Sequence, residues 1–179
     1  IERPRCFLDE GENRIWIGSK DHGLYLYNKV TGKYKNYLAD AEVPGSISSN
    51  DIYGLAKDAA GNLWVATKQG VDKYDHKLKQ FIHFNESNGL PANWVCGLLI
   101  DNEQNVWVST SNGIAKINPE TLKINTYDII DGLQGNEFEG YVALKTNDGH
   151  MLFGGRNGFN YFMPEEITDN TKLPEIVLT

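Results

Sequence analysis

The residues best suited to contact a ligand recur at one point of a repeated sequence pattern. Three asparagines at intervals of 43 residues are each followed by a residue of different chemistry: Asn50 with Asp51, Asn93 with Trp94 and Asn136 with Glu137. The flat face of a tryptophan can stack on a sugar ring, and carboxylates and carboxamides accept hydrogen bonds from hydroxyl groups. We therefore take these six residues, together with Arg5, as candidate ligand-binding residues.

Each candidate also has a purely structural interpretation. Asparagines that recur in every repeat can cap turns by bonding to nearby backbone groups. Trp94 can anchor its loop against a neighbouring repeat, and Glu137 can belong to a solvated loop. Arg5 can bind an acidic sugar, or its position in the repeat can be a consequence of where this sequence begins. The residues alone leave these alternatives open.

Catalysis has weak support in the sequence. Glycoside hydrolysis needs two carboxylates at a set separation, and the acidic residues that could supply them are Asp51, Asp131, Glu137 and Glu139. Any acidic sequence contains such pairs, and the four histidines are too scattered to form a nucleophilic triad. Zinc spacings, calcium loops and nucleotide-binding glycine loops are not recognisable in the sequence. We expect no catalytic residue, no metal and no cofactor, although a lyase or glycosidase stays an alternative.

The composition limits the partners. The formal net charge is -7, whereas a nucleic-acid groove or an anionic lipid surface requires clustered lysine and arginine. Apolar runs of about 18 residues, which a membrane span needs, do not occur, so a membrane link would come from regions outside this sequence. Cys6 and Cys96 lie in different repeats, and we expect two buried free thiols, with a disulfide as the alternative.

The candidate residues lie on a repeated framework. A polar turn, an apolar strand centred on a tryptophan and a second turn ending in glycine occur three times, and a fourth copy has Leu152 in place of the tryptophan. Trp16, Trp64 and Trp107 are 48 and 43 residues apart, and Leu152 follows after 45 more. A period of about 40–50 residues with four strands per unit is typical of the blades of a β-propeller.

One repeat shows the expected strands, at residues 52–56, 63–67, 71–74 and 79–84. They are rich in β-branched and aromatic residues, and glycine, asparagine and aspartate separate them. The predicted fold is all-β, a partial β-propeller of about four antiparallel four-stranded blades. We assign the blades to residues 1–49, 50–92, 93–135 and 136–170, and residues 171–179 to a linker.

Other repeated residues are expected to be structural. Trp16, Trp64 and Trp107 should pack between adjacent blades, because contacts between blades are the only core that a propeller has. Gly54, Gly97 and Gly140 are spaced by 43 residues and should let the innermost strands approach closely. The same alignment places Arg5 at this glycine position in the first repeat.

A chain of about four blades would leave sheet faces open at both ends. Exposed apolar faces and strand edges favour association. We therefore expect a homodimer or other self-association through open blade edges, or closure on further blades of a longer protein.

Four motifs resemble a known family. Residues 58–75 read DAAGNLWVATKQGVDKYD, and residues 88–95, 131–138 and 154–164 read NGLPANWV, DGLQGNEF and GGRNGFNYFMP. They resemble the two-component regulator propeller repeat, and the resemblance covers nearly the whole chain. The last motif resembles the final blade, and LPEIVLT at residues 173–179 resembles the junction to a following immunoglobulin-like domain.

The resemblance implies a function for the chain. It implies a non-enzymatic fragment from the periplasmic sensor of a hybrid two-component histidine kinase, which senses oligosaccharides from glycan breakdown. From the residues alone, a propeller that binds another protein is the alternative. Convergence of Trp94, Glu137 and Arg5 on the axis would favour a small ligand, whereas a flat apolar outer surface would favour a protein partner.

Overall fold

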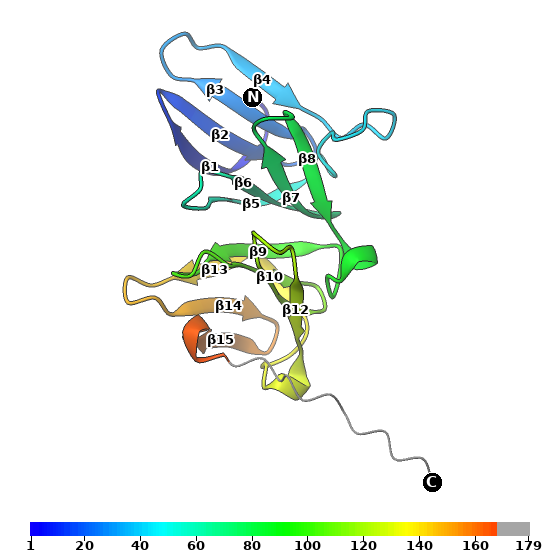
Figure 1. Cartoon of the computed structure of the whole chain (residues 1–179), viewed down its shortest axis with the longest axis vertical. Helices are drawn as coiled ribbons and strands as arrows, with labels where there is room; N and C mark the ends of the chain where they lie inside the picture. The colour runs from blue at the N-terminus through cyan, green and yellow to red at the C-terminus, as the bar shows by residue number, and fades with distance from the viewer. Residues whose placement is uncertain (168–179) are drawn as a thin grey trace.

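Four antiparallel sheets are stacked along the long axis of the molecule in chain order (Figure 1). The computed structural model describes residues 1–167, which contain fifteen strands and three short 3-10 helices. Within each sheet, strands that are consecutive in the sequence are neighbours. The prediction of an all-β partial propeller is confirmed.

The first three blades contain four strands each, and the fourth contains three among residues 1–167. The first blade contains β1 (Pro4–Gly11), β2 (Arg14–Ser19), β3 (Leu24–Asn28) and β4 (Tyr34–Tyr37). The second contains β5 (Ile52–Lys57), β6 (Leu63–Thr67), β7 (Gly70–Asp75) and β8 (Gln80–Phe84). The third contains β9 (Val95–Ile100), β10 (Val106–Thr110), β11 (Gly113–Ile117) and β12 (Ile124–Tyr127). The fourth contains β13 (Phe138–Lys145), β14 (Met151–Gly155) and β15 (Gly158–Phe162).

The fourth blade departs from the prediction. It has three strands among the described residues rather than four. The helix η3 (Pro164–Glu166) follows β15, and the predicted linker at residues 171–179 lies outside the described residues. The other two 3-10 helices, η1 (Glu86–Asn88) and η2 (Ile129–Asp131), follow the outer strands of the second and third blades.

Tight turns join the second and third strands of each blade. Gly70 has a φ of 133°, and a Cβ there would lie 2.1 Å from the carbonyl oxygen of Phe84. Only glycine meets both demands, because a left-handed φ and a close backbone approach exclude a side chain. The hydroxyl of Thr67 donates to the Gly70 carbonyl at 3.0 Å, and that of Thr110 donates to Gly113 at the same distance.

The tryptophans form the interfaces between blades. Trp16, Trp64 and Trp107 are at most 1% exposed. Trp64 Nε1 donates to Asp58 Oδ2 at 2.9 Å, and Trp107 Nε1 donates to the corresponding aspartate, Asp101, at 2.8 Å. A buried indole N–H needs such an acceptor. Trp16 Nε1 has no acceptor within residues 1–167, so the first blade lacks this bond.

The first strands of adjacent blades pack against one another, β1 on β5, β5 on β9 and β9 on β13. Each of these inner strands carries an irregularity near its start, where one or more residues bulge out of the ladder. Bulges bend a strand and redirect side chains. Arg5, Tyr53 and Cys96 are the bulged residues of the first three blades.

The predicted place of Arg5 is wrong by one residue. Cys6 pairs with Gly18 as Gly54 pairs with Ala66 and Gly97 with Ser109, so Cys6 occupies the glycine position. The turn between β1 and β2 has an irregular register, which shifts the alignment by one residue.

Gly140 is also displaced from the position predicted for it. It lies in the irregular part of β13, between Phe138 and Ala143. Val142, not Gly140, lies against Gly154 of the neighbouring strand. The bulge holds three residues instead of the one in each of the other blades, and these two extra residues account for the displacement.

Candidate functional site

Four backbone carbonyls mark one end of the inner strands. Each accepts a hydrogen bond of 3.0–3.2 Å from the second turn of its own blade: Arg3 from Lys20, Asp51 from Lys68, Trp94 from Ser111 and Glu137 from Arg156. We call these eight residues the rim. The shared bond shows that Asp51, Trp94 and Glu137 are equivalent, as their spacing predicted, and adds Arg3 as the fourth member.

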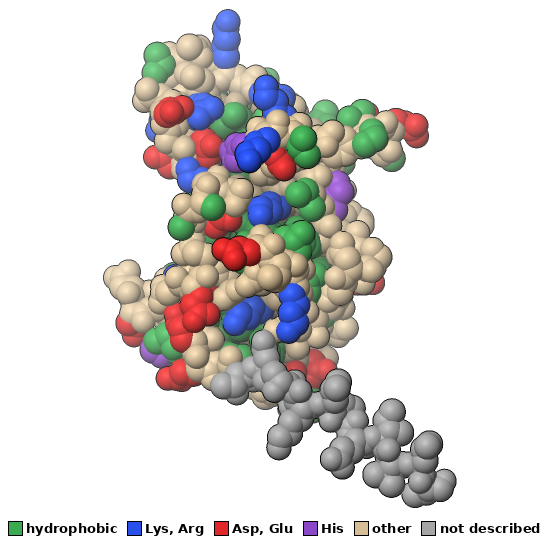
Figure 2. All heavy atoms as spheres, in the orientation of Figure 1, with side chains coloured by type: hydrophobic (Ala, Val, Ile, Leu, Met, Phe, Trp, Pro, Cys, Tyr) green, Lys and Arg blue, Asp and Glu red, His purple; other side chains and the backbone are tan. Residues whose placement is uncertain are grey.

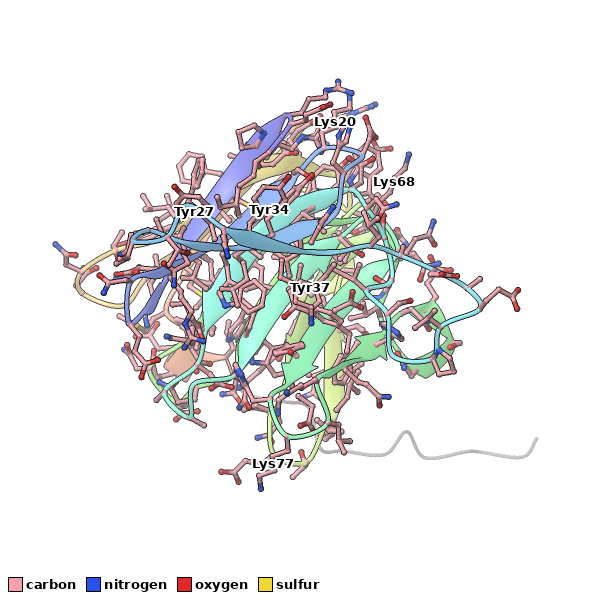
Figure 3. The ribbon with its side chains drawn as sticks, turned by 90° about the horizontal axis from the view of Figure 1, so that it is seen from above. Lys20, Tyr27, Tyr34, Tyr37, Lys68 and Lys77 are labelled. Carbon is pink, nitrogen blue, oxygen red and sulfur yellow. The ribbon has the colours of Figure 1, made fainter. Side chains whose placement is uncertain are left out.

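The view from the first blade shows the rim at one end of the sheets. Lys20 and Lys68 lie close together there, whereas Lys77 in the turn after β7 lies at the opposite end (Figure 3). The equivalent positions therefore keep one backbone role while their side chains change from Arg to Asp, Trp and Glu. Positions that serve only to hold the blade would be free to repeat the same residue, as the tryptophans do.

An aromatic cluster adjoins the rim and shares Trp94 with it. Its members are Arg5, Tyr53, Trp94 and Tyr141, from all four blades. The Arg5 guanidinium lies 5.2 Å from the Tyr53 ring centre and 5.4 Å from that of Tyr141. Tyr53 stacks on Tyr141 at 5.3 Å and contacts Trp94 at 5.9 Å.

The cluster leaves ring surface accessible to solvent. Trp94 is 43% exposed, although one side of it lies against Tyr53. Tyr141 is 48% exposed and adopts a φ of 68°. A non-glycine residue in this region of backbone space is strained and calls for a reason. Here the strained bulge in β13 turns the Tyr141 ring onto Tyr53.

The charge of Arg5 is satisfied within the protein. Its Nη1 donates to Asp51 Oδ1 at 2.9 Å, and the two side chains are 20% and 14% exposed. A partly buried pair of this kind is stronger than an exposed one, and the tyrosine rings add a cation–π contribution. Arg5 and Asp51 therefore form a fixed neutral pair, and Arg5 is not a free cation awaiting an acidic ligand.

The repeated asparagines brace loops. The side-chain oxygens of Asn50, Asn93 and Asn136 accept hydrogen bonds from the backbone of the preceding loop at 2.8, 2.9 and 3.0 Å. Their partners are the N–H groups of Ala39, Glu86 and Ile129. This geometry matches the turn-capping interpretation and positions the rim residue that follows each asparagine.

The carboxylates near the rim are paired. Arg156 Nε lies 2.9 Å from Glu137 Oε2 and 3.8 Å from Glu139 Oε1, and all three side chains are more than half exposed. Asp131 Oδ2 accepts the backbone N–H of Asp128 at 2.9 Å as part of a capping box. None of these four acidic residues, Asp51 included, is arranged as a free acid beside a second carboxylate, so the geometry does not favour hydrolysis.

Two thiols and one phenol near the rim are unreactive at neutral pH. Cys6 and Cys96 are free thiols, and burial raises their pKa values to about 11 and about 12. Burial likewise raises the pKa of Tyr141 to about 12, although Arg5 opposes the shift. The thiols and the phenol therefore stay protonated at neutral pH. A nucleophilic cysteine needs a lowered pKa, so neither thiol is suited to that role.

Tyr53, Tyr141 and Arg3 are among the residues of this site that sequence reasoning missed. Tyr53 and Tyr141 face the cluster because they lie at bulges, and a bulge is a property of strand register. Arg3 was missed because the irregular turn after β1 displaced the alignment of the first repeat. Its guanidinium pairs with Asp21 at 2.7 Å at the exposed edge of the rim.

Residues 1–167 contain no group of three or more histidine, cysteine, aspartate or glutamate side chains that could hold a metal ion. In the same residues, no helix has the length and apolar character that crossing a membrane requires.

Stacked antiparallel blades with a shared tryptophan core and a variable rim define this chain as part of a β-propeller. Residues 46–69 and 89–112 match the two-component regulator propeller family. These two segments therefore carry repeats of the two-component regulator propeller family, as the motifs predicted.

Known proteins similar to this chain are longer. It is 31% identical to histidine kinase P4 of Formosa agariphila over an alignment 229 residues long. The alignment covers the whole of this chain but 17% of that protein. The extracellular domain of the hybrid two-component system BT3049 from B. thetaiotaomicron superposes with a TM-score of 0.79 at 25% identity, over 90% of this chain and 22% of that one. The corresponding domain of BT4673 gives 0.73 at 26% identity, over 92% and 23%.

Proposed function

We propose that this chain is part of the periplasmic sensor propeller of a two-component histidine kinase, and that its rim binds a neutral oligosaccharide. The similarity to extracellular domains of hybrid two-component systems supports the sensor assignment. The observation that carries the ligand assignment is the aromatic cluster, in which Trp94 is 43% exposed at the rim. The accessible rings of Trp94 and Tyr141 offer stacking surfaces for sugar rings, whose C–H faces are apolar.

The charge of the site favours a neutral sugar over an acidic one. Arg5 is neutralised by Asp51 at 2.9 Å, and Arg156 is held by Glu137 at 2.9 Å. A uronic acid that bound either arginine would have to break its ion pair, whereas hydroxyl groups can bond to the carboxylate oxygens without breaking it. The acidic net charge of -7 would also repel an anionic ligand.

The signalling role follows from the arrangement of the cluster. Its four residues come from the inner strands, or the loops before them, of all four blades. A ligand that contacts several of them would stabilise one arrangement of neighbouring blades over others. A ligand shifts a conformational equilibrium by its difference in affinity between the two states, and that shift would be transmitted to the kinase.

Calorimetric titration of the complete sensor region against neutral and uronate-containing oligosaccharides tests the proposal. We expect a neutral glycan to bind and Trp94→Ala to weaken binding at least about tenfold, since a stacked ring contributes on the order of 1 kcal/mol or more. Tyr34→Ala, which removes an aromatic ring 55% exposed on the first blade, should leave the affinity unchanged. Glycan binding that Trp94→Ala does not alter would contradict the rim as the site.

A protein partner is the second candidate function. The outward faces of the first and last blades carry large exposed apolar side chains, among them Phe7 and Phe159, each 64% exposed, and Leu144, 58% exposed. Tyr27 and Tyr34 lie on the same outward face of the first blade (Figure 3). Such faces expose apolar side chains, as the protein-platform alternative requires. Failure of every sugar to bind, with capture of a protein through these faces, would favour this function.

A further inference from the structure

The tryptophan of the first blade lacks the partner that the tryptophans of the next two blades have. Trp64 Nε1 and Trp107 Nε1 each donate to a carboxylate six residues earlier in the chain, that of Asp58 or Asp101. Trp16 is 1% exposed, and its Nε1 has no hydrogen-bond partner among residues 1–167. A buried donor without an acceptor is destabilising and calls for an explanation.

The residue at the aspartate position of the first blade is a glutamate. Leu8 and Ala56 pair with the tryptophans of the first two blades. Two residues further along lie Glu10 in the first blade and Asp58 in the second. The Glu10 side chain is 9% exposed, and its Oε2 lies 3.4 Å from Lys57 Nζ of the second blade. The carboxylate at the position that accepts an indole N–H elsewhere is therefore held by a lysine of the neighbouring blade.

A second donor of the first blade is also without an acceptor. In the second and third blades an asparagine, Asn62 or Asn105, donates to the same aspartate through its backbone and side-chain N–H groups. Arg14 takes this place in the first blade, two residues before the tryptophan. Its Nη2 lies 3.0 Å from Glu12 Oε2, whereas its Nε is buried and has no partner among residues 1–167. Both positions that meet an aspartate in the other blades thus carry an N–H group that has no acceptor in the described part of the chain.

The turn between β1 and β2 explains the difference. Glu12 and Asn13 form a two-residue turn with φ values of 47° and 62°, and Glu10 bulges out of the ladder just before it. In the second blade, Asp58 instead donates its N–H across a longer turn to the carbonyl of Asn62 at 3.1 Å. A bulge redirects side chains, so the Glu10 carboxylate reaches the second blade rather than the indole.

A cavity of about 270 Å³ lies beside the unpartnered indole, between the first and second blades. It is lined by Trp16, Arg14, Glu10, Leu26, Lys35 and Lys79 among others. In the second and third blades a lysine that pairs with the tryptophan, Lys73 or Lys116, lies over its ring at 5.2 or 5.4 Å. The shorter Leu26 takes this place in the first blade. The volume approaches the range of about 300–1,000 Å³ that is typical of small-molecule sites.

The cavity carries more positive than negative charge. Its cationic side chains are Arg14, Lys35 and Lys79. The negative charge of Glu10 is offset by Lys57 at 3.4 Å. Burial raises the pKa of Tyr74, which also lines the cavity, to about 12, so this phenol stays neutral. The local charge is therefore opposite in sign to the net charge of -7 of the whole chain, and it favours an anion.

We propose that this cavity binds the carboxylate group of a small molecule. The carboxylate accepts hydrogen bonds from Trp16 Nε1 and Arg14 Nε, as the aspartate side chains of the next two blades do at the equivalent positions. Lys35 and Lys79 offset its charge. Because both donors are buried, a small ligand fits this site and a protein surface does not.

Arg14 is the side chain that has to turn to admit the carboxylate. It is 39% exposed, and its partner Glu12 is 85% exposed. An exposed ion pair of this kind contributes little to stability, so Arg14 can exchange it for a ligand at small cost. Lys79 lies in the turn between β7 and β8, which is at the end of the blades opposite the rim (Figure 3). The inference therefore does not depend on the sugar site.

An NMR titration of the indole N–H signals with sodium acetate tests the proposal on the full 179-residue chain. Variants that replace one tryptophan with phenylalanine assign the signals. Acetate should shift the Trp16 signal in a saturable way. The signals of Trp64 and Trp107, which already bond to aspartates, should change little. Sodium chloride at the same ionic strength and pH should not reproduce the shift.

Substitutions of the cationic side chains locate the site. Arg14→Gln should weaken the affinity for acetate at least about tenfold, because a charge-assisted hydrogen bond is lost. Lys79→Gln removes one charge from the lining and should weaken it less. Lys77→Gln is the matched control, because Lys77 lies two residues away in the same turn, outside the residues that line the cavity, and should leave the affinity unchanged.

A double variant tests the same site by filling it. Glu10→Asp combined with Arg14→Asn copies the aspartate and the asparagine of the next two blades. The new aspartate should accept the Trp16 N–H, so acetate should no longer shift the Trp16 signal, and the melting temperature should not fall.

Four results would overturn the proposal. The first is the absence of a saturable shift of the Trp16 signal with acetate. The second is an equal shift with sodium chloride. The third is a response to acetate that persists in the double variant. The fourth is a saturable response to inorganic phosphate but not to acetate, which would assign the cavity to a phosphate group.

Discussion

The interfaces between blades and the rim use the same repeat in opposite ways. At the interfaces, equivalent positions keep one residue, so that Trp16, Trp64 and Trp107 are all buried to 1% exposure or less. At the rim, equivalent positions share one backbone hydrogen bond but carry Arg3, Asp51, Trp94 and Glu137. The repeat therefore separates the residues that hold the fold from those that are free to specify a ligand.

A second contrast lies between exposed and internal blade faces. Phe81 on the second blade is 5% exposed, whereas its equivalent on the first blade, Tyr34, is 55% exposed. Apolar side chains are visible along the surface that the blades share (Figure 2). The terminal faces retain the composition of a core without being covered, which fits a chain that spans 17% of its curated relative.

Truncation of a blade-core tryptophan should produce the largest loss of stability. Trp64→Ala should lower the free energy of unfolding by about 3–5 kcal/mol, because a fully buried indole leaves a large cavity. Trp94→Ala removes a 43% exposed ring and should cost on the order of 1 kcal/mol or less. Urea unfolding of the two variants measures the difference, and equal losses would contradict the division between core and rim.

Loss of the aspartate that accepts the indole N–H should have an intermediate effect. Asp58→Ala leaves Trp64 Nε1 buried without its 2.9 Å acceptor, so about 1–3 kcal/mol of stability should be lost. Asp75→Ala is the matched control in the same blade, because it removes only exposed hydrogen bonds, from the backbone N–H groups of Lys77 and Leu78, and should cost less. A negligible difference between them would show that the bond does not stabilise the blade.

The same aspartate should also contribute a pH dependence. Burial raises the pKa of Asp58, but hydrogen bonds from Trp64 and Asn62 more than offset it, so the pKa lies below 3.8. A lowered pKa adds stability that is present above pH 3.8 and lost as the pH falls through the folded-state value. Acid unfolding of Asp58→Asn should therefore show a shallower fall in stability below pH 3.8 than the unaltered chain.

The inner-strand glycines offer a matched pair of substitutions. A Cβ on Gly97 would lie 2.8 Å from the Cβ of Ala143 in the next blade, whereas a Cβ on Gly54 would lie 3.5 Å from its nearest neighbour, Ala66. Gly97→Ala should cost about 1–3 kcal/mol through overpacking, and Gly54→Ala should be close to neutral. Thermal unfolding compares the two, and equal melting temperatures would show that the inner strands tolerate separation.

The smallest predicted effect concerns the loop between β4 and β5, which projects from the stacked sheets (Figure 1). Ser48 Oγ donates to buried Asp72 at 2.9 Å, and His83 Nδ1 lies 2.7 Å from the same carboxylate. The hydrogen bond to Asp72 raises the pKa of His83 above 6.5, although burial opposes it. The stabilising contribution is therefore complete below pH 6.5 and is lost as the pH rises through the folded-state value.

Hydrogen exchange at Ser48 measures this effect, because its backbone N–H donates to Asp72 at 2.8 Å. The opening free energy derived from exchange should decrease as the pH rises above 6.5, and His83→Gln should remove that trend. If the pH trend persists in His83→Gln, titratable groups other than His83 cause it.

Much of the framework was predictable because strands, turns and tryptophans follow local patterns. The interval of 43 residues placed Asp51, Trp94 and Glu137 at equivalent positions, and their backbone bonds agree with it. Tyr53 and Tyr141 were not predictable, since their bulges depend on how two strands pair. The pairing of Arg5 with Asp51 joins residues 46 apart in the sequence and depends on how the inner strands of two blades meet.

The most direct test of the separation between core and rim uses the indole N–H signals of the four tryptophans in an NMR titration with a bound neutral oligosaccharide. Variants that replace each tryptophan with phenylalanine assign the signals. The account predicts that the Trp94 signal shifts with ligand concentration while those of Trp16, Trp64 and Trp107 change little. Saturable binding that shifts a core tryptophan and leaves Trp94 unchanged would contradict it.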